Sequence, residues 1–142
     1  MRLSTEIANQ VTRLGGLSTD GQLESVQWPT GTFNWSPARI RSQFPDLADV
    51  DEYAMEDYIR PVRDLEFVTS DSGFWPGWEK DFQGTDSSRF HPFSSDEAFF
   101  YFIDSSCSSD NPDIYYVDHE STNEEPYHPE SYTLETFLRV LE

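Results

Sequence analysis

Residues Asp118, His119 and Glu120 are adjacent side chains whose types could bind a metal ion or transfer a proton. They follow an apolar, aromatic run that is typical of a strand. Successive side chains of a strand point to opposite faces, so Asp118 and Glu120 would share one face and His119 would lie on the other. The other histidines, His91 and His128, have no ligand at i+3 or i+4. We therefore expect neither a metal site nor a bound cofactor.

The sequence also lacks the common motifs of catalytic and nucleotide-binding sites. The sequence contains no G-x-S-x-G, no P-loop and no glycine-rich dinucleotide turn. Paired carboxylates can cleave glycosides, but acids occur throughout the chain and nothing marks out one pair. We therefore expect that the protein is not an enzyme. The alternative is a small enzyme that uses paired carboxylates.

The charge of the chain is its most pronounced property. Its 142 residues have a formal net charge of −18, with 27 Asp and Glu against 9 Lys and Arg. Such a chain should repel nucleic acid and anionic membranes, because binding phosphate requires Lys and Arg. It should attract basic partners, and faster at low salt. The alternative is that the acidity serves only solubility or adaptation to high salt.

Many of the acids are close together in the second half of the chain. Eight occur in 104–113 and 118–130, which flank one predicted strand: Asp104, Asp110, Asp113, Asp118, Glu120, Glu124, Glu125 and Glu130. We expect them to form one negative surface at one end of the sheet, either as a docking surface or as a solvated rim. Trp75 and Trp78 could form a binding platform, or they could close the hydrophobic core over the sheet.

The sequence gives few signals for the cellular location of the protein. The single cysteine, Cys107, excludes an internal disulfide, and the first ten residues have no apolar segment typical of a signal peptide. The longest apolar run, 98–103, is far shorter than the roughly 20 residues that span a bilayer. We expect a cytoplasmic protein.

The elements in the first half are predicted from periodicity and end signals. Residues 4–14 indicate a helix with Ser4 or Thr5 as its N-cap, stopped by two glycines. A short helix is expected over 37–44, and a second one between Asp46 and Pro61. Its apolar stripe is Leu47, Val50, Tyr53, Ala54, Met55, Tyr58 and Ile59. Residues 22–28 and 62–69 alternate as strands do.

The second half predicts a sheet closed by a helix. Residues 97–103 are a nearly continuous aromatic run, and apolar side chains on both faces favour a central strand that pairs antiparallel with 113–118. A polar loop is expected over 119–132, and an amphipathic helix after Thr133. Together these elements predict one α+β domain over residues 1–142, with a mainly antiparallel sheet of about four to six strands and helices packed on it.

Three segments, in this order, resemble a known family. FHPFSSDEAFFYFID (90–104), PDIYYVDHES (112–121) and TLETFLRVL (133–141) are similar to conserved segments of the SUKH superfamily. The resemblance covers residues 60–142, and the first 59 residues match only loosely. In one departure, the family usually has glycines before the aromatic strand where this chain has Ser94-Ser95-Asp96-Glu97, so we expect another turn geometry there.

The resemblance implies a function. The superfamily groups bacterial immunity proteins, which neutralise toxins, with a fungal regulator of cell-wall assembly. We therefore expect a monomeric, non-catalytic protein that binds a toxin, and the acidity of the chain favours a basic toxin such as a nuclease. The predicted binding residues combine the acidic cluster with one aromatic anchor: Asp110, Asp113, Glu120, Glu124, Glu125 and Trp75. A regulatory or scaffolding module that binds a cellular protein is the alternative.

Overall fold

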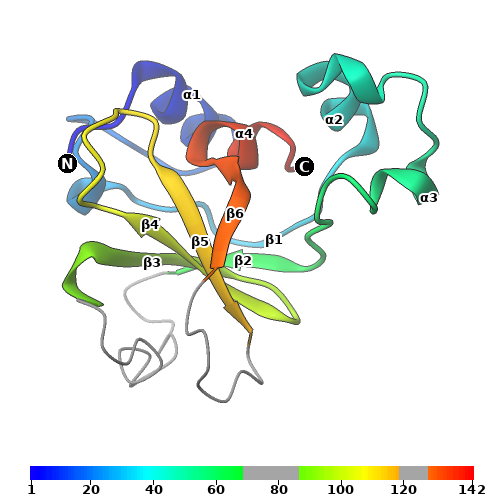
Figure 1. The fold of residues 1–142 in the computed structure, drawn as a ribbon. Coiled ribbons are helices and arrows are strands. Elements are labelled where there is room, and N and C mark those ends of the chain that lie inside the picture. Colours follow the sequence, from blue (N-terminus) through cyan, green and yellow to red (C-terminus); the bar gives the residue numbers. More distant parts are fainter. Residues whose placement is uncertain (69–86, 119–127) are drawn as a thin grey trace.

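The sheet has six antiparallel strands, and each strand pairs with its neighbours in chain order (Figure 1). The computed structural model describes residues 1–68, 87–118 and 128–142. The strands are β1 (Thr32–Phe33), β2 (Leu65–Phe67), β3 (Phe90–Ser95), β4 (Phe99–Asp104), β5 (Asp113–Asp118) and β6 (His128–Thr133). This architecture confirms the predicted α+β class with a mainly antiparallel sheet.

Helices occupy the start, the middle and the end of the described chain. The α-helices are α1 (Thr5–Arg13), α2 (Pro37–Gln43), α3 (Glu52–Met55) and α4 (Leu134–Arg139). Short 3-10 turns are η1 (Leu23–Ser25), η2 (Pro45–Leu47) and η4 (Ser87–Arg89). In this part of the chain no helix has the length and the apolar character needed to cross a membrane.

The β4–β5 hairpin confirms the predicted pairing of the two aromatic runs. Phe99 lies opposite Asp118, and Ile103 lies opposite Ile114. Neighbouring residues of β4 are buried on different faces, since Tyr101 belongs to the main core and Phe102 to a smaller cluster on the other face. This double burial explains why β4 lacks the polar alternation of a half-exposed strand.

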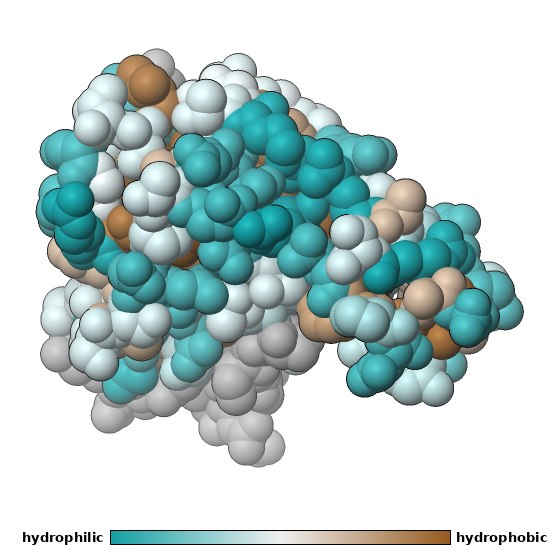
Figure 2. Space-filling view, turned by 90° about the horizontal axis from the view of Figure 1, so that it is seen from above, coloured by the Kyte–Doolittle hydropathy of each residue, from teal (hydrophilic) through white to brown (hydrophobic). Residues whose placement is uncertain are grey.

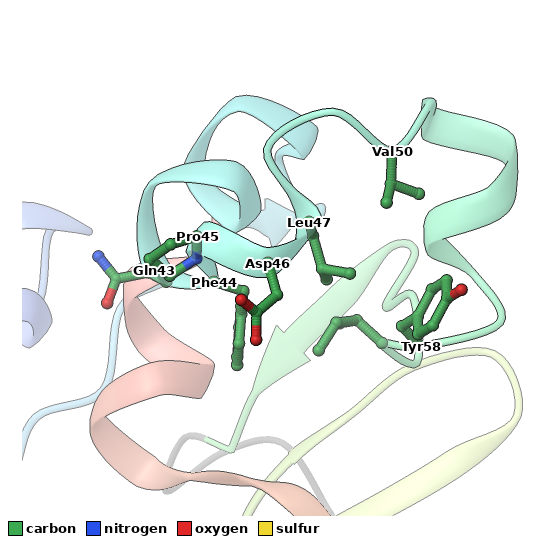
Figure 3. Close-up of a pocket in the computed structure, with 8 residues that line it drawn as sticks. Gln43, Phe44, Pro45, Asp46, Leu47, Val50 and Tyr58 are labelled. Atoms are coloured by element: carbon green, nitrogen blue, oxygen red, sulfur yellow. The ribbon is translucent and has the colours of Figure 1, made fainter.

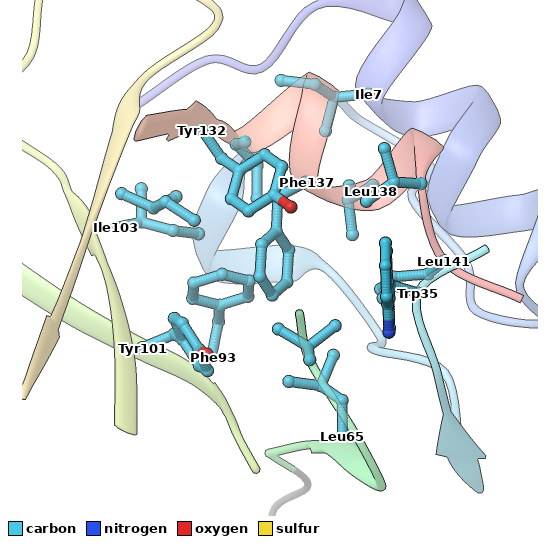
Figure 4. Packing of buried hydrophobic residues seen from close by; sticks show 14 of the residues in the cluster. Ile7, Trp35, Leu65, Phe93, Tyr101, Ile103, Tyr132, Phe137, Leu138 and Leu141 are labelled. Carbon is cyan, nitrogen blue, oxygen red and sulfur yellow. The ribbon is translucent and has the colours of Figure 1, made fainter. Parts of the chain in front are cut away.

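The main core lies between the sheet and the terminal helices. In Figure 4, Ile7 from α1 and Phe137 and Leu138 from α4 point toward Phe93 and Tyr101 of the sheet. Each of these side chains is fully buried. Because aromatic rings bury a large apolar area, their contacts hold the two helices on the sheet.

Both terminal helices begin at the residues predicted as caps. The Ser4 hydroxyl accepts a hydrogen bond from the Ile7 N–H at 3.1 Å, and Thr133 accepts one from Thr136 at 3.4 Å. α1 is followed by Gly15, which has φ of 104°, a value that glycine adopts without strain. These local signals explain why the two helices were predictable from sequence.

Three predicted elements differ from the structure. Within 22–28 the structure has the short turn η1 and two isolated bridges, at Gln22 and Gln27, rather than a strand. The predicted helix after Asp46 is broken into η2 and the one-turn helix α3. Strand β6 occupies part of the segment expected to be a polar loop, because backbone pairing with β5 does not require apolar side chains.

The turn before β4 is organised by a carboxylate. Asp96 Oδ1 accepts hydrogen bonds from the N–H groups of Ala98 at 2.9 Å and Phe99 at 2.8 Å. Within the described residues, Asp64 is the non-glycine residue with a positive φ, so the turn at 94–98 has no left-handed position that requires glycine. The expected departure from a glycine turn therefore has a physical basis in the side chain of Asp96.

Candidate protein-binding surface

Asp110 and Asp113 are exposed at one end of the sheet, where the chain passes from β4 to β5. The backbone of this connection contacts both terminal helices. The carbonyl of Asp110 accepts from the N–H of Ser4 at 2.9 Å, and Pro112 accepts from Leu134 at the same distance. The two carboxylates thus project from a connection whose backbone is fixed by the first turns of α1 and α4.

The expected single negative surface at one end of the sheet is contradicted for Asp118. Asp113 and Asp118 are the first and last residues of β5, about 17 Å apart along an antiparallel strand. The segment after Asp118 therefore starts at the end of β5 opposite Asp110. The other predicted binding residues, Glu120, Glu124, Glu125 and Trp75, lie outside the described residues and stay a prediction.

Asp104 does not belong to an acidic surface. Its side chain is buried, its Oδ2 accepts from Arg89 at 2.9 Å, and its Oδ1 accepts from the Ser106 hydroxyl at 2.6 Å. A buried carboxylate with these partners stabilises the end of β4 and is not accessible to a partner protein. Its inclusion among the acids expected on the surface was wrong.

Asp118, the first residue of the Asp118-His119-Glu120 sequence, is exposed at the end of β5. His119 and Glu120 lie outside the described residues. Across 1–68, 87–118 and 128–142, no group of three or more His, Cys, Asp or Glu side chains is arranged to hold a metal ion.

His91 lies half-buried in β3, and it lines a cavity of about 360 Å³ together with Trp28 and Glu24. Burial lowers the pKa of His91 below its usual value near 6.5, although the negative charge of Glu24 opposes this shift. The neutral imidazole is therefore the form that the folded protein favours.

His91 should make the folded state less stable in mild acid. Below about pH 6.5 the unfolded chain binds a proton at His91 more readily than the folded chain, so this contribution to the free energy of unfolding falls as pH falls. We expect His91→Gln to reduce the loss of stability between about pH 7 and pH 5, measured by urea unfolding at each pH. A stability difference between variant and wild type that is constant with pH would contradict this assignment.

An acidic helical segment projects from the body of the molecule beside the sheet. We call residues 44–59, which contain η2 and α3, the acidic arm (Figure 1). From residue 42 to residue 59 the chain has no Lys, Arg or His, and all its acids are exposed: Asp46, Asp49, Asp51, Glu52, Glu56 and Asp57. Among the described residues Glu56 pairs with Arg63, whereas Asp46 and Asp49 form no ion pair. The charges of Asp46 and Asp49 are therefore available to a partner.

The acidic arm exposes two aromatic rings that the sequence prediction assigned to an apolar stripe. Tyr53 is 90% exposed and Tyr58 is 63% exposed, whereas Leu47, Met55 and Ile59 are buried. The stripe was expected on one continuous helix, whereas η2 ends at Leu47 and α3 spans only Glu52–Met55, so the helical spacing that would align the tyrosines with the buried residues is not continuous. In Figure 2 the projecting part of the molecule shows hydrophobic and hydrophilic surface next to each other.

A groove of about 480 Å³ runs between the two halves of the acidic arm. Figure 3 shows Leu47, Val50 and Tyr58 around this space, with the carboxylate of Asp46 beside it. Phe44 contributes a further apolar side chain. The groove thus combines apolar walls with a negative charge, and its volume lies within the range of known ligand pockets.

Contacts with the rest of the molecule hold the acidic arm at its C-terminal end. The guanidinium of Arg60 lies 3.4 Å from the centroid of the Phe99 ring, and its Nε donates to the Tyr101 hydroxyl at 3.2 Å. The carbonyl of Arg60 accepts from the Tyr132 hydroxyl at 3.0 Å. Within the arm region, Arg41 donates to the carbonyl of Val50 at 3.2 Å. The groove is therefore built on a segment with defined anchors.

Sequence reasoning missed this surface, although one signal was present. Residues 46–57 contain six acids and no basic residue, which differs from a helix with mixed charges. Apolar periodicity in the same segment predicted an amphipathic helix with the tyrosines on its apolar stripe.

Comparisons of the chain with protein-family models, with curated proteins and with solved structures found no match. The surface must therefore be interpreted from its own chemistry.

Proposed function

We propose that this chain is a non-catalytic protein that binds a basic partner protein. The observation that carries the proposal is the acidic arm, where exposed Tyr53 and Tyr58 stand among six exposed acids. Tyrosine is enriched in protein interfaces because its ring supplies a large contact area at low conformational cost. Asp46 and Asp49, which form no ion pair among the described residues, fit a partner that carries Lys and Arg.

The resemblance to the SUKH superfamily supports a particular class of partner. By that resemblance the partner is a toxin domain, and binding neutralises it. A nuclease toxin would fit the charge, because an enzyme that holds phosphate carries a basic cleft. An acidic protein seated over such a cleft would exclude nucleic acid by charge and by bulk. The same chemistry would serve a regulatory protein that binds a basic cellular partner, and the identity of the partner distinguishes the two.

Capture of partner proteins at two salt concentrations tests this proposal. We expect the tagged chain to retain a basic protein at about 50 mM salt and to release most of it at about 500 mM, because salt screens the charges at an exposed interface. The captured protein should then be purified, assayed for toxic activity in cells, and assayed again with this chain co-expressed.

Three outcomes separate the possibilities. Loss of toxicity on co-expression would support neutralisation. A captured basic protein without toxicity would favour the regulatory alternative. Retention of only neutral or acidic proteins, with no change between the two salt concentrations, would contradict the proposal of a basic partner.

A further inference from the structure

The groove in the acidic arm has the composition of a site for an amphipathic segment. Its walls are apolar side chains contributed by both halves of the arm: Phe44, Leu47, Val50 and Ile59, with the ring of Tyr58 at one side. Leu47 and Ile59 form its inner part, since both are buried, whereas Tyr58 is 63% exposed. A partner side chain in this space would contact apolar atoms while the rest of the partner remains outside the groove.

The charges around the groove restrict which partner can enter it. Asp46 lines the groove, and Asp49 and Asp57 are exposed close to it in the chain. A second copy of this chain would bring the same acids against them, and like charges disfavour that contact. Anionic lipid and nucleic acid are disfavoured for the same reason. The complementary occupant is apolar on one side and positively charged on the other.

We infer that the groove binds the apolar face of a cationic amphipathic helix of the partner, an inference that rests on the proposed function. Apolar side chains at i, i+3, i+4 and i+7 of that helix fill the groove. Lys and Arg on its flanks lie against Asp46 and Asp49. Because Arg60 and Arg41 hold the arm, the groove exists before binding, and less ordering is required when the helix enters.

A synthetic peptide of Leu and Lys can test the inference on the whole chain. The probe is a peptide of about 14 residues with Leu at amphipathic helical spacing and Lys elsewhere. The control peptide has the same composition in an order that gives no apolar face. Amide chemical shifts of the ¹⁵N-labelled protein report where the peptide binds, and calorimetry gives its Kd.

Two pairs of substitutions separate the arm from general attraction by charge. Asp46→Asn with Asp49→Asn changes the acidic arm, and Asp110→Asn with Asp113→Asn removes the same number of charges from exposed residues at the end of β5. Val50→Asn makes one wall of the groove polar. Tyr58→Ala shortens its exposed side and provides a second groove variant if Val50→Asn does not fold.

We expect the amphipathic peptide to shift amides in 44–59 and to bind at least about fivefold more tightly than its control. The Asp46 and Asp49 pair and either groove variant should weaken binding by about fivefold or more, whereas the Asp110 and Asp113 pair should change it by less than about twofold. Shifts located elsewhere, or equal binding of both peptides, would overturn the inference.

The captured natural partner separates failure of the inference from failure of the proposed function. If a basic partner binds all arm variants as tightly as wild type, the groove assignment is wrong and the proposed function stands. If binding falls with the Asp110 and Asp113 pair instead, the partner uses the surface predicted from sequence. If no basic partner is captured at low salt, the proposed function itself fails.

Discussion

Phe137→Ala is expected to lower the free energy of unfolding by about 3–5 kcal/mol. Phe137 has no exposed surface, and its ring packs against aromatic rings of the sheet. Its ring centroid lies 5.5 Å from that of Phe93, 5.2 Å from Tyr101 and 5.7 Å from Tyr132. Truncation removes these contacts and leaves a cavity between α4 and the sheet, where rigid neighbouring rings limit collapse.

Urea unfolding followed by circular dichroism provides the measurement, with Tyr53→Ala as the control. Tyr53 is 90% exposed, so its loss should change the free energy of unfolding by less than about 0.5 kcal/mol. Phe137→Leu should fall between the two variants because it keeps part of the buried volume. If the free energy of unfolding of Phe137→Ala were within about 1 kcal/mol of the wild-type value, the packing of Phe137 against the sheet would not be a major source of stability.

Asp96→Ala should lower the free energy of unfolding by about 3 kcal/mol, because hydrogen bonds to a charged group contribute more than neutral ones. The buried carboxylate accepts from the Ala98 and Phe99 N–H groups and, at 2.9 Å, from the Tyr101 hydroxyl. Burial raises the pKa of Tyr101 above its usual value, so its hydroxyl keeps the proton that it donates to Asp96. Removal of the carboxylate leaves these donors without their acceptor.

The neighbouring residue supplies a matched control for Asp96. Glu97→Ala removes the same charge from an exposed position, and its effect should stay below about 0.5 kcal/mol. A double-mutant cycle of Asp96→Ala with Tyr101→Phe should give a coupling of about 1 kcal/mol or more. Equal stability of Asp96→Ala and Glu97→Ala would refute the assigned role.

The Tyr101 hydroxyl that donates to Asp96 also accepts a hydrogen bond from Arg60, which anchors the acidic arm. We therefore expect Asp96→Ala to weaken peptide binding at the acidic arm as well.

The predictable parts of the fold are those whose signals are local. Strand β5 matches its predicted bounds, and α4 begins after the predicted cap Thr133. A cap and its recipient N–H are three residues apart, so the sequence contains both partners of the interaction. The double burial of β4 was also predictable, since an apolar run of that length requires cover on both faces.

The sequence predicted that a binding surface of this protein would be acidic, but it did not predict where on the molecule that surface lies. Asp110 and Asp113 are exposed, as expected for residues of a docking surface or of a solvated rim, and their role in binding stays a prediction. Asp118 does not join Asp110 and Asp113, because the two ends of a strand point to opposite edges of the sheet. The groove was not predicted, because Phe44 and Ile59 are fifteen positions apart in the chain and meet only through the break between η2 and α3.

The sequence by itself determined the α+β class, the central aromatic strand, the capped terminal helices and a net charge of −18. These properties depend on composition and on interactions within about one helical turn or one strand. The tertiary structure decided which acids are accessible: it buried Asp104 against Arg89, and it left Tyr53 and Tyr58 exposed on the acidic arm. The reason is physical, because exposure depends on what the rest of the chain places against a residue, and periodicity reports only the residue's own neighbours.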